Sequence, residues 1–318
     1  MTNKNYAKGI AYGIISLLFL SLEPIIANSR PAEIDSFIYG AMTSIIMSAI
    51  FLPLMLLERK RLKTNLESLD SVKENEKIQE VNSLLNGFKN HRWLFIYLGI
   101  NFAFAYVLFF WGYELAGAIN GSLAQKMDLI FALLFGFLIN KEKITKTQII
   151  FSFVLFFGLI IAITRGSFNL IEFNLGVIIL IITTMLWMSA HAITRPILEK
   201  KEISPFQLVF MRNLISGIIL FVFYLAFFGN RALILLLNPI NLYNFILMGI
   251  VYGIDLCCYY LALSYIKVSK VSILMAPSLF ITTFFATIFL SEVFTIFHLI
   301  GSVLVIISIV IIIRLKEE

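Results

Sequence analysis

The sequence predicts an all-α membrane protein of ten transmembrane helices, arranged as two repeats of five that cross the bilayer in opposite senses. Hydrophobic residues make up 60% of the 318 residues and charged residues only 14%, whereas soluble domains are about half apolar and about a quarter charged. The apolar residues also gather in long runs, close to the roughly 20 residues that a helix needs to cross the hydrocarbon core. We therefore expect an integral, multi-pass membrane protein.

Ten apolar windows of this length follow one another along the chain. They show no alternation of the kind found in membrane β-barrels, and in lipid a helix satisfies its own backbone hydrogen bonds. The expected spans are 9–28, 35–57, 93–113, 117–139 and 147–165 in the first half, and 174–197, 205–228, 242–263, 269–290 and 295–313 in the second. The expected repeats are 1–168 and 169–318.

The basic residues between the spans fall mainly on alternate connections, which predicts their orientation. With the amino terminus in the cytoplasm, the outer segments keep only Arg30, Arg165 and Arg231. Both termini are then cytoplasmic. The net charge of +6 is explained by this asymmetry, so we expect no nucleic-acid partner and place the protein in the cytoplasmic membrane of a prokaryote.

The long cytoplasmic connection, 58–91, carries apolar residues at helical spacing. These are Leu62, Leu66, Leu69 and Val72, followed by Ile78, Val81, Leu85 and Phe88. Together with the basic run at 59–61, they are typical of an amphipathic helix at an anionic membrane surface. A solvated linker is the alternative.

The two halves of the chain resemble each other. A shift of 150 positions aligns 97–163 with 247–313 without a gap, and Glu142 then meets Glu292 while Thr145 meets Thr295. Five spans is an odd number, so the repeats must be inverted, an arrangement that places a transporter's substrate site at mid-membrane. We expect both glutamates to cap the helix that follows them.

The same joints resemble a known family. The segments 137–145 (FLINKEKIT) and 289–295 (FLSEVFT), with Pro277 and Gly301, are similar to the EamA-like branch of the drug/metabolite transporter superfamily. The resemblance implies a secondary carrier or exporter of small metabolites with cytoplasmic termini. The chain departs from the family pattern at Met127, which takes the place matching Pro277, and at Met42, which aligns with Arg212.

Ionisable residues within the spans mark a functional site, because each costs about 2.5–3.5 kcal/mol at a helix centre unless it faces a partner or water. The candidates for a substrate or proton pathway are these and their polar neighbours. They are Glu23, Lys126, Asp128, His191, Arg212, Tyr252, Asp255 and Tyr259.

Asp128 belongs to a stripe of small residues that lets another helix approach closely, so it is expected to line a substrate or proton path. Lys126 lies about 160° around the helix from it and needs another partner, for which Glu23 is the candidate. A fixed interhelical ion pair is the alternative. Glu23 precedes Pro24, which suits a proton-linked gate beside a kink, or a helix cap.

Asp255 is flanked at helical spacing by Tyr252 and Tyr259. The two phenols can form an aromatic wall for a ligand or a locking network with the carboxylate. Arg212 can neutralise Asp255 or an anionic substrate, or form a structural salt bridge. His191 can bind a ligand, although a satisfied core histidine is the commoner case.

These features predict a secondary active transporter of small metabolites or amphipathic compounds, working by alternating access about a central cavity, with proton coupling left open. An intramembrane enzyme or a passive channel is the alternative. The sequence contains no His-Glu-x-x-His, Gly-x-Ser-x-Gly or Walker motif, so we expect no catalytic residue, metal or cofactor. The expected partners are a small-molecule substrate, the lipid bilayer and protons, and the protein is a monomer or a homodimer.

Overall fold

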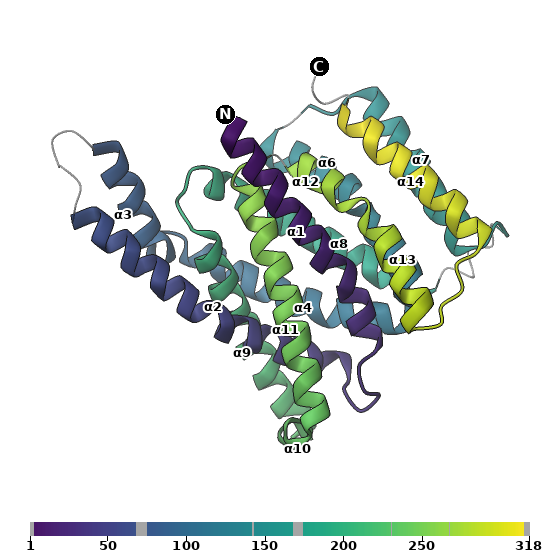
Figure 1. Cartoon of the computed structure of the whole chain (residues 1–318), viewed down its shortest axis with the longest axis horizontal. Coiled ribbons are helices and arrows are strands. Elements are labelled where there is room, and N and C mark those ends of the chain that lie inside the picture. The colour runs from purple at the N-terminus through teal and green to yellow at the C-terminus, as the bar shows by residue number, and fades with distance from the viewer. Residues whose placement is uncertain are drawn as a thin grey trace.

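The structure, a computed structural model, describes residues 3–67, 75–141, 143–167, 174–229, 231–266 and 268–314. Within these ranges every regular element is helical (Figure 1). Eight helical stretches are long and apolar enough to cross a membrane, and the shorter apolar helices Ser278–Phe289 and Ile296–Ile312 follow. Large apolar side chains such as Phe153 and Phe104 are 70% and 68% exposed, which suits a surface that meets lipid. The predicted all-helical membrane class is confirmed.

The helices correspond closely to the expected spans. The first half contains α1 (Asn3–Asn28), α2 (Ser36–Glu67), α3 (Asn75–Asn90), α4 (Arg92–Ala116), α5 (Ala118–Ala124), the 3₁₀ turn η1 (Gln125–Met127), α6 (Asp128–Asn140) and α7 (Lys146–Ile163). The second half contains α8 (Leu175–Glu199), α9 (Pro205–Phe228), α10 (Arg231–Leu237), α11 (Pro239–Leu263), α12 (Val268–Met275), α13 (Ser278–Phe289) and α14 (Ile296–Arg314).

Short polar residues begin several of these helices. Asn174, Ser204 and Asn238 each accept a hydrogen bond from a backbone N–H two or three residues further on, which satisfies a first-turn donor that has no partner within the helix. Pro205 and Pro239 follow two of these caps. Proline is well suited to that position, because its missing N–H would have no helical partner there.

Two of the expected spans are broken near their middle. The span 117–139 divides into α5, η1 and α6, and the span 269–290 divides into α12 and α13. The segment from Ala118 to Ile139 still qualifies as one membrane span, as the sequence predicted, but neither segment is one continuous α-helix. Pro277 accounts for the second break, since it cannot donate to the helix. The first break falls at the corresponding position, around Met127, without a proline.

In the joint between α13 and α14, Thr295 and Glu292 cap two different helices. Thr295 caps α14, because its N–H donates to His298 Nδ1 at 3.0 Å and its hydroxyl accepts from the N–H of His298 at 3.3 Å. Glu292 caps α5 in the other half of the chain. The expectation that Glu292 caps the next helix is therefore wrong. Glu142, its counterpart, lies outside the described residues.

The connection 58–91 contains two helical pieces. α2 continues to Glu67 and carries Leu62 and Leu66, while Leu69 and Val72 lie outside the described residues. α3 is amphipathic, with Ile78, Val81 and Leu85 half-buried. Two contacts hold it against the turn between α8 and α9: Lys201 pairs with Glu80 at 2.7 Å, and His91, which follows α3, lies 2.9 Å from Glu202. The amphipathic helix predicted for this segment is thus present over 75–90.

The packing of the helices is symmetric when the two halves are exchanged. α1 packs on α11, as its counterpart α8 packs on α4. α2 packs on α9, and α7 packs on α14 at one edge of the molecule (Figure 1). α6 contacts α8, just as α13 contacts α1. Each half therefore contributes its first, third and broken fourth helices to a shared centre.

Candidate functional site

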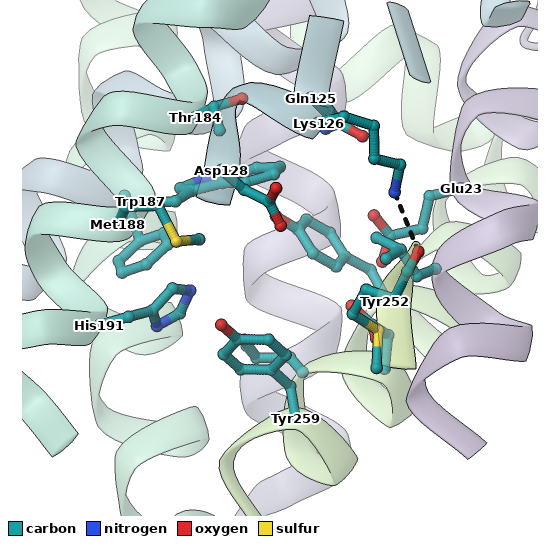
Figure 2. A pocket seen from close by; sticks show the side chains of 15 residues that line it. Glu23, Gln125, Lys126, Asp128, Thr184, Trp187, Met188, His191, Tyr252 and Tyr259 are labelled. Atoms are coloured by element: carbon teal, nitrogen blue, oxygen red, sulfur yellow. Dashed lines mark hydrogen bonds between the residues drawn. The ribbon is translucent and has the colours of Figure 1, made fainter. Parts of the chain in front are cut away.

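A cavity lies at this shared centre. Its volume is about 70 Å³, and side chains of α1, α4, η1, α6, α8, α11 and α12 line it. Of the eight residues that the sequence predicted, seven line it: Glu23, Lys126, Asp128, His191, Tyr252, Asp255 and Tyr259. Arg212 does not. Ionisable groups far apart in sequence are therefore gathered around one space (Figure 2).

Glu23 and Asp255 face each other across the contact of α1 with α11. Each carboxylate lies within electrostatic reach of the other, and Asp255 accepts a hydrogen bond from the hydroxyl of Ser16. Neither oxygen of Glu23 meets a hydrogen-bond donor among the described residues. Two ionised carboxylates have no donor to offer each other, so a single proton held between them would convert the contact into a hydrogen bond.

Lys126 bridges the two broken helices. Its ammonium donates to the main-chain carbonyl oxygen of Met275 at 3.0 Å and to the hydroxyl of Ser278 at 2.6 Å. The break at Pro277 leaves the Met275 carbonyl without its usual helical donor, and the carboxyl end of α12 carries the negative end of its helix dipole. The partner of Lys126 is thus this break, where the sequence had suggested Glu23.

Asp128 begins α6 directly after η1, so its carboxylate enters the cavity from the broken helix. One of its oxygens accepts a hydrogen bond from the N–H of Leu129 at 2.7 Å. Figure 2 shows its carboxylate directed into the cavity, which the rings of Trp187, Tyr252 and Tyr259 also line. It forms no ion pair within the part of the chain that the structure describes.

Arg212 is fully buried beside the cavity in α9. Its guanidinium donates to the hydroxyls of Tyr260 and Tyr106 at 2.6 and 2.8 Å, and it lies over the ring of Phe102, 3.4 Å from the ring centre. Tyr106 in turn donates to Asn213 at 2.7 Å. These contacts tie α4, α9 and α11 together. The arginine is therefore engaged by hydroxyls and a ring, with no carboxylate among its hydrogen-bond partners in the described chain.

His191 and Tyr259 form one end of the cavity. Their ring centres are 4.7 Å apart, and neither His191 Nδ1 nor the hydroxyl of Tyr259 has a hydrogen-bond partner among the described residues. Tyr252 instead belongs to an aromatic wall, since its ring is stacked on Phe109 at 5.7 Å and lies 6.3 Å from Trp187. The two tyrosines that flank Asp255 in sequence thus line different parts of the cavity: Tyr259 lies beside His191, and Tyr252 lies beside Phe109 and Trp187.

Several lining residues were not singled out from the sequence. They include Phe102, Gln125, Thr184, Trp187, Met188 and Met275. Apart from Gln125 and Thr184 they are apolar or aromatic, so nothing distinguishes them from lipid-facing residues until the helices are packed. Gln125 and Thr184 did carry a signal, because they are polar groups within spans. The described residues contain no group of three His, Cys, Asp or Glu side chains placed to hold a metal ion.

The sequence profile of the EamA-like transporter family matches residues 7–164 and, a second time, residues 174–314. This chain belongs to the EamA-like transporter family. The resemblance read from the two Glu-x-x-Thr joints is confirmed, and with it the class of integral, multi-pass membrane protein. The EamA-like chain is also similar to one solved crystal structure over 98% of its own length and 99% of the other chain, with a TM-score of 0.64 and 13% identity. At that identity the likeness shows the fold alone. None of the curated proteins matches this sequence.

Proposed function

We propose that this chain is a secondary active transporter of small solutes that works by alternating access and couples solute movement to protons. The observation that carries the proposal is the central cavity. Glu23 and Asp128 from the first half and Asp255 from the second line one space between the two halves. Buried charges that converge on a shared cavity mark a substrate or ion path in membrane proteins.

The symmetry of the packing supports two inverted repeats, 1–168 and 169–318, that rock against each other. Corresponding helices make corresponding contacts, and both broken helices border the cavity. Irregular backbone at membrane depth is tolerated where it lines a cavity, and broken helices border the substrate site in several transporters. α1 begins and α14 ends on the same side of the molecule (Figure 1), as ten crossings with both termini in the cytoplasm require.

Proton coupling is supported by the contact of Glu23 with Asp255. In a buried site two adjacent carboxylates repel each other unless one is protonated or a cation lies close by. The pair can therefore hold a proton in one state and release it in another. Because the proton gradient across a prokaryotic cytoplasmic membrane points inward, exchange of solute for protons would export the solute.

The test is flux in reconstituted proteoliposomes that hold a pH-sensitive dye. An outwardly directed gradient of a transported solute is expected to acidify the interior, because protons enter in exchange for the solute that leaves. An imposed pH gradient is expected to drive the solute against its own gradient. Downhill flux that ignores the pH gradient would favour the passive channel and contradict proton coupling. Chemical change of the solute would favour an enzyme.

A further inference from the structure

We propose that the cavity takes a small organic cation, a protonated amine carried on an apolar or aromatic body that lacks a carboxylate. This inference rests on the transporter proposed above and names its substrate class. It is argued from the charges that line the cavity, from the partners that those charges already have, and from the rings around them.

The cavity has an excess of negative groups. Three carboxylates, Glu23, Asp128 and Asp255, line it, against one ammonium, that of Lys126. None of the three carboxylates forms an ion pair within the described ranges. Sharing a proton removes the charge of one member of the Glu23–Asp255 pair, and Asp128, although Lys126 lies two residues away, has no direct ion-pair partner among the described residues. A positive ligand would give the Asp128 carboxylate the direct partner that it lacks.

The Lys126 ammonium and both terminal nitrogens of Arg212 already donate hydrogen bonds, and only Nε of Arg212 lacks a partner among the described residues. Lys126 donates to Met275 and Ser278 at the break of the opposite repeat. Arg212 donates to two tyrosine hydroxyls, lies over a phenylalanine ring and is absent from the lining. To pair with a cation, a ligand carboxylate would have to displace Lys126 or Arg212 from its partners. The donors of the lining that are unpaired in the described chain, such as Gln125 Nε2 and Trp187 Nε1, are uncharged. Amines are therefore favoured over amino acids and organic acids.

The surroundings of Asp128 suit an ammonium group. Figure 2 shows its carboxylate directed into the cavity, which the aromatic side chains of Trp187, Tyr252 and Tyr259 also line. A cation near a carboxylate is stabilised further by the faces of aromatic rings, which attract positive charge most strongly where water is excluded. Leu20, Met188 and Leu256 complete the lining and provide contact for an apolar body.

The polar end of the cavity suits a neutral substituent. The hydroxyl of Tyr259 and Nδ1 of His191 lack partners among the described residues, and their rings are 4.7 Å apart. A hydroxyl on the far side of the ligand can hydrogen-bond to them without adding charge. An amine at Asp128 and an uncharged polar group at His191 and Tyr259 would fit only after the cavity, about 70 Å³ in this structure, widens during the transport cycle.

Four indole derivatives separate charge from shape: tryptamine, tryptophan, tryptophol and indole-3-acetate. Binding to the purified full chain in nanodiscs is measured at pH 7 by isothermal titration calorimetry, with the phenyl series phenethylamine, phenylalanine and phenylacetate alongside. We expect each amine to bind at least about tenfold more tightly than the zwitterion or the acid of its series. Equal or tighter binding of a zwitterion or an acid overturns the inference, and so does failure of both amines to bind.

Variants identify the anchor. Asp128→Asn is expected to weaken tryptamine binding by about tenfold or more and to leave tryptophol binding nearly unchanged, while Asp128→Glu retains most of the preference for the amine. Glu199→Gln removes an exposed carboxylate outside the cavity and serves as the matched control. Equal weakening of tryptamine and tryptophol by Asp128→Asn would show a merely structural role for Asp128 and overturn its assignment.

A transport assay in proteoliposomes distinguishes failure of the cation inference from failure of the proposed transporter function. If nanodisc samples bind tryptamine and proteoliposomes never move it, the transporter proposal fails while the charge selectivity of the cavity stands. If proteoliposomes move tryptophan or tryptophol in preference to tryptamine, the transporter stands and the cation inference fails.

Discussion

The carboxylate of Glu292 accepts hydrogen bonds from the N–H groups of Ala118 and Ile119, at 2.6 and 2.9 Å, although these residues lie about half the chain away. Both donors belong to the first turn of α5, where N–H groups have no helical partner. Next to this contact, His298 of α14 lies 3.2 Å from the side-chain oxygen of Asn120. The two halves are therefore held together at the side where α4 ends, and a cycle that opens this side must break the Glu292 contact.

Replacing Glu292 by Gln leaves one acceptor oxygen where two were used. We expect the loss to destabilise the closed arrangement by about 1–2 kcal/mol and to raise the reactivity of a cysteine placed at the buried position 119. The measurement is thiol labelling of Ile119→Cys in membranes, with Cys257 and Cys258 replaced by Ser. Unchanged labelling in the Glu292→Gln background would contradict a latch at this joint.

Glycine substitutions test the same contact from the other side. Gly117 has a φ of +78°, and a Cβ there would lie 3.0 Å from Oε1 of Glu292. Gly229 has a φ of +60°, with nothing within 4 Å of its Cβ position. Both Gly→Ala changes bear a backbone strain of about 1–3 kcal/mol, because both glycines combine a positive φ with an extended ψ, and only Gly117→Ala displaces Glu292. We expect a larger fall in melting temperature for Gly117→Ala, and equal falls would contradict the argument.

Glu23→Gln places an amide donor beside Asp255 and imitates the protonated pair. Exchange of solute for solute across proteoliposomes should persist, because it requires no change of protonation. Flux driven by an imposed pH gradient should fall at least about tenfold. Solute counterflow and dye-monitored proton movement in the same preparation check this. A pH-driven flux equal to that of the wild type would remove Glu23 from the coupling.

The fold was largely predictable because a helix in lipid must be long, apolar and internally hydrogen-bonded. The length and the apolar composition of each segment therefore identify it as a transmembrane helix. Windows such as 93–113 and 205–228 fall within α4 and α9. The break at Met127 was not predictable, because no proline or glycine marks it. It lies opposite the break at Pro277, so the packing of the second repeat against the first accounts for it better than any local signal.

The charged residues of the candidate site were predictable from the sequence, but the hydrogen-bond partners of those residues were not. The cost of a buried charge identifies Glu23, Lys126, Asp128 and Asp255 from sequence alone. Their partners depend on which helices meet. Lys126 binds a main-chain carbonyl freed by a helix break, and Ser16, the donor to Asp255, resembles any other small residue of a transmembrane helix.

Arg212 is expected to be structural, and its variants should report on stability. Lys keeps the charge, but its single nitrogen cannot reproduce a planar fork that meets two hydroxyls and a ring. We expect Arg212→Lys to lower the free energy of unfolding by about 2–4 kcal/mol, and Tyr106→Phe to lower it by about 1–2 kcal/mol. Thermal unfolding in detergent, followed by size-exclusion fluorescence, measures both. A stable Arg212→Lys protein that binds no amine would instead give the arginine a direct role in the site.

The pair of α7 and α14 depends on close approach at two glycines. A Cβ added at Gly158 would lie 3.0 Å from the carbonyl oxygen of Gly301 and 2.9 Å from Cβ of Leu304. Small residues let helices in lipid pack through their backbones, where no hydrophobic effect drives them together. Gly158→Val should therefore separate the two helices and lower the free energy of unfolding by about 1–3 kcal/mol through overpacking.

Phe153→Leu, on the exposed face of the same helix, is the control and should leave the melting temperature within a degree or two. Because α7 and α14 contribute no side chain to the central cavity, we expect Gly158→Val to lower stability while amine binding by the folded fraction keeps its affinity, and a matching loss of affinity would tie this edge of the molecule to the site.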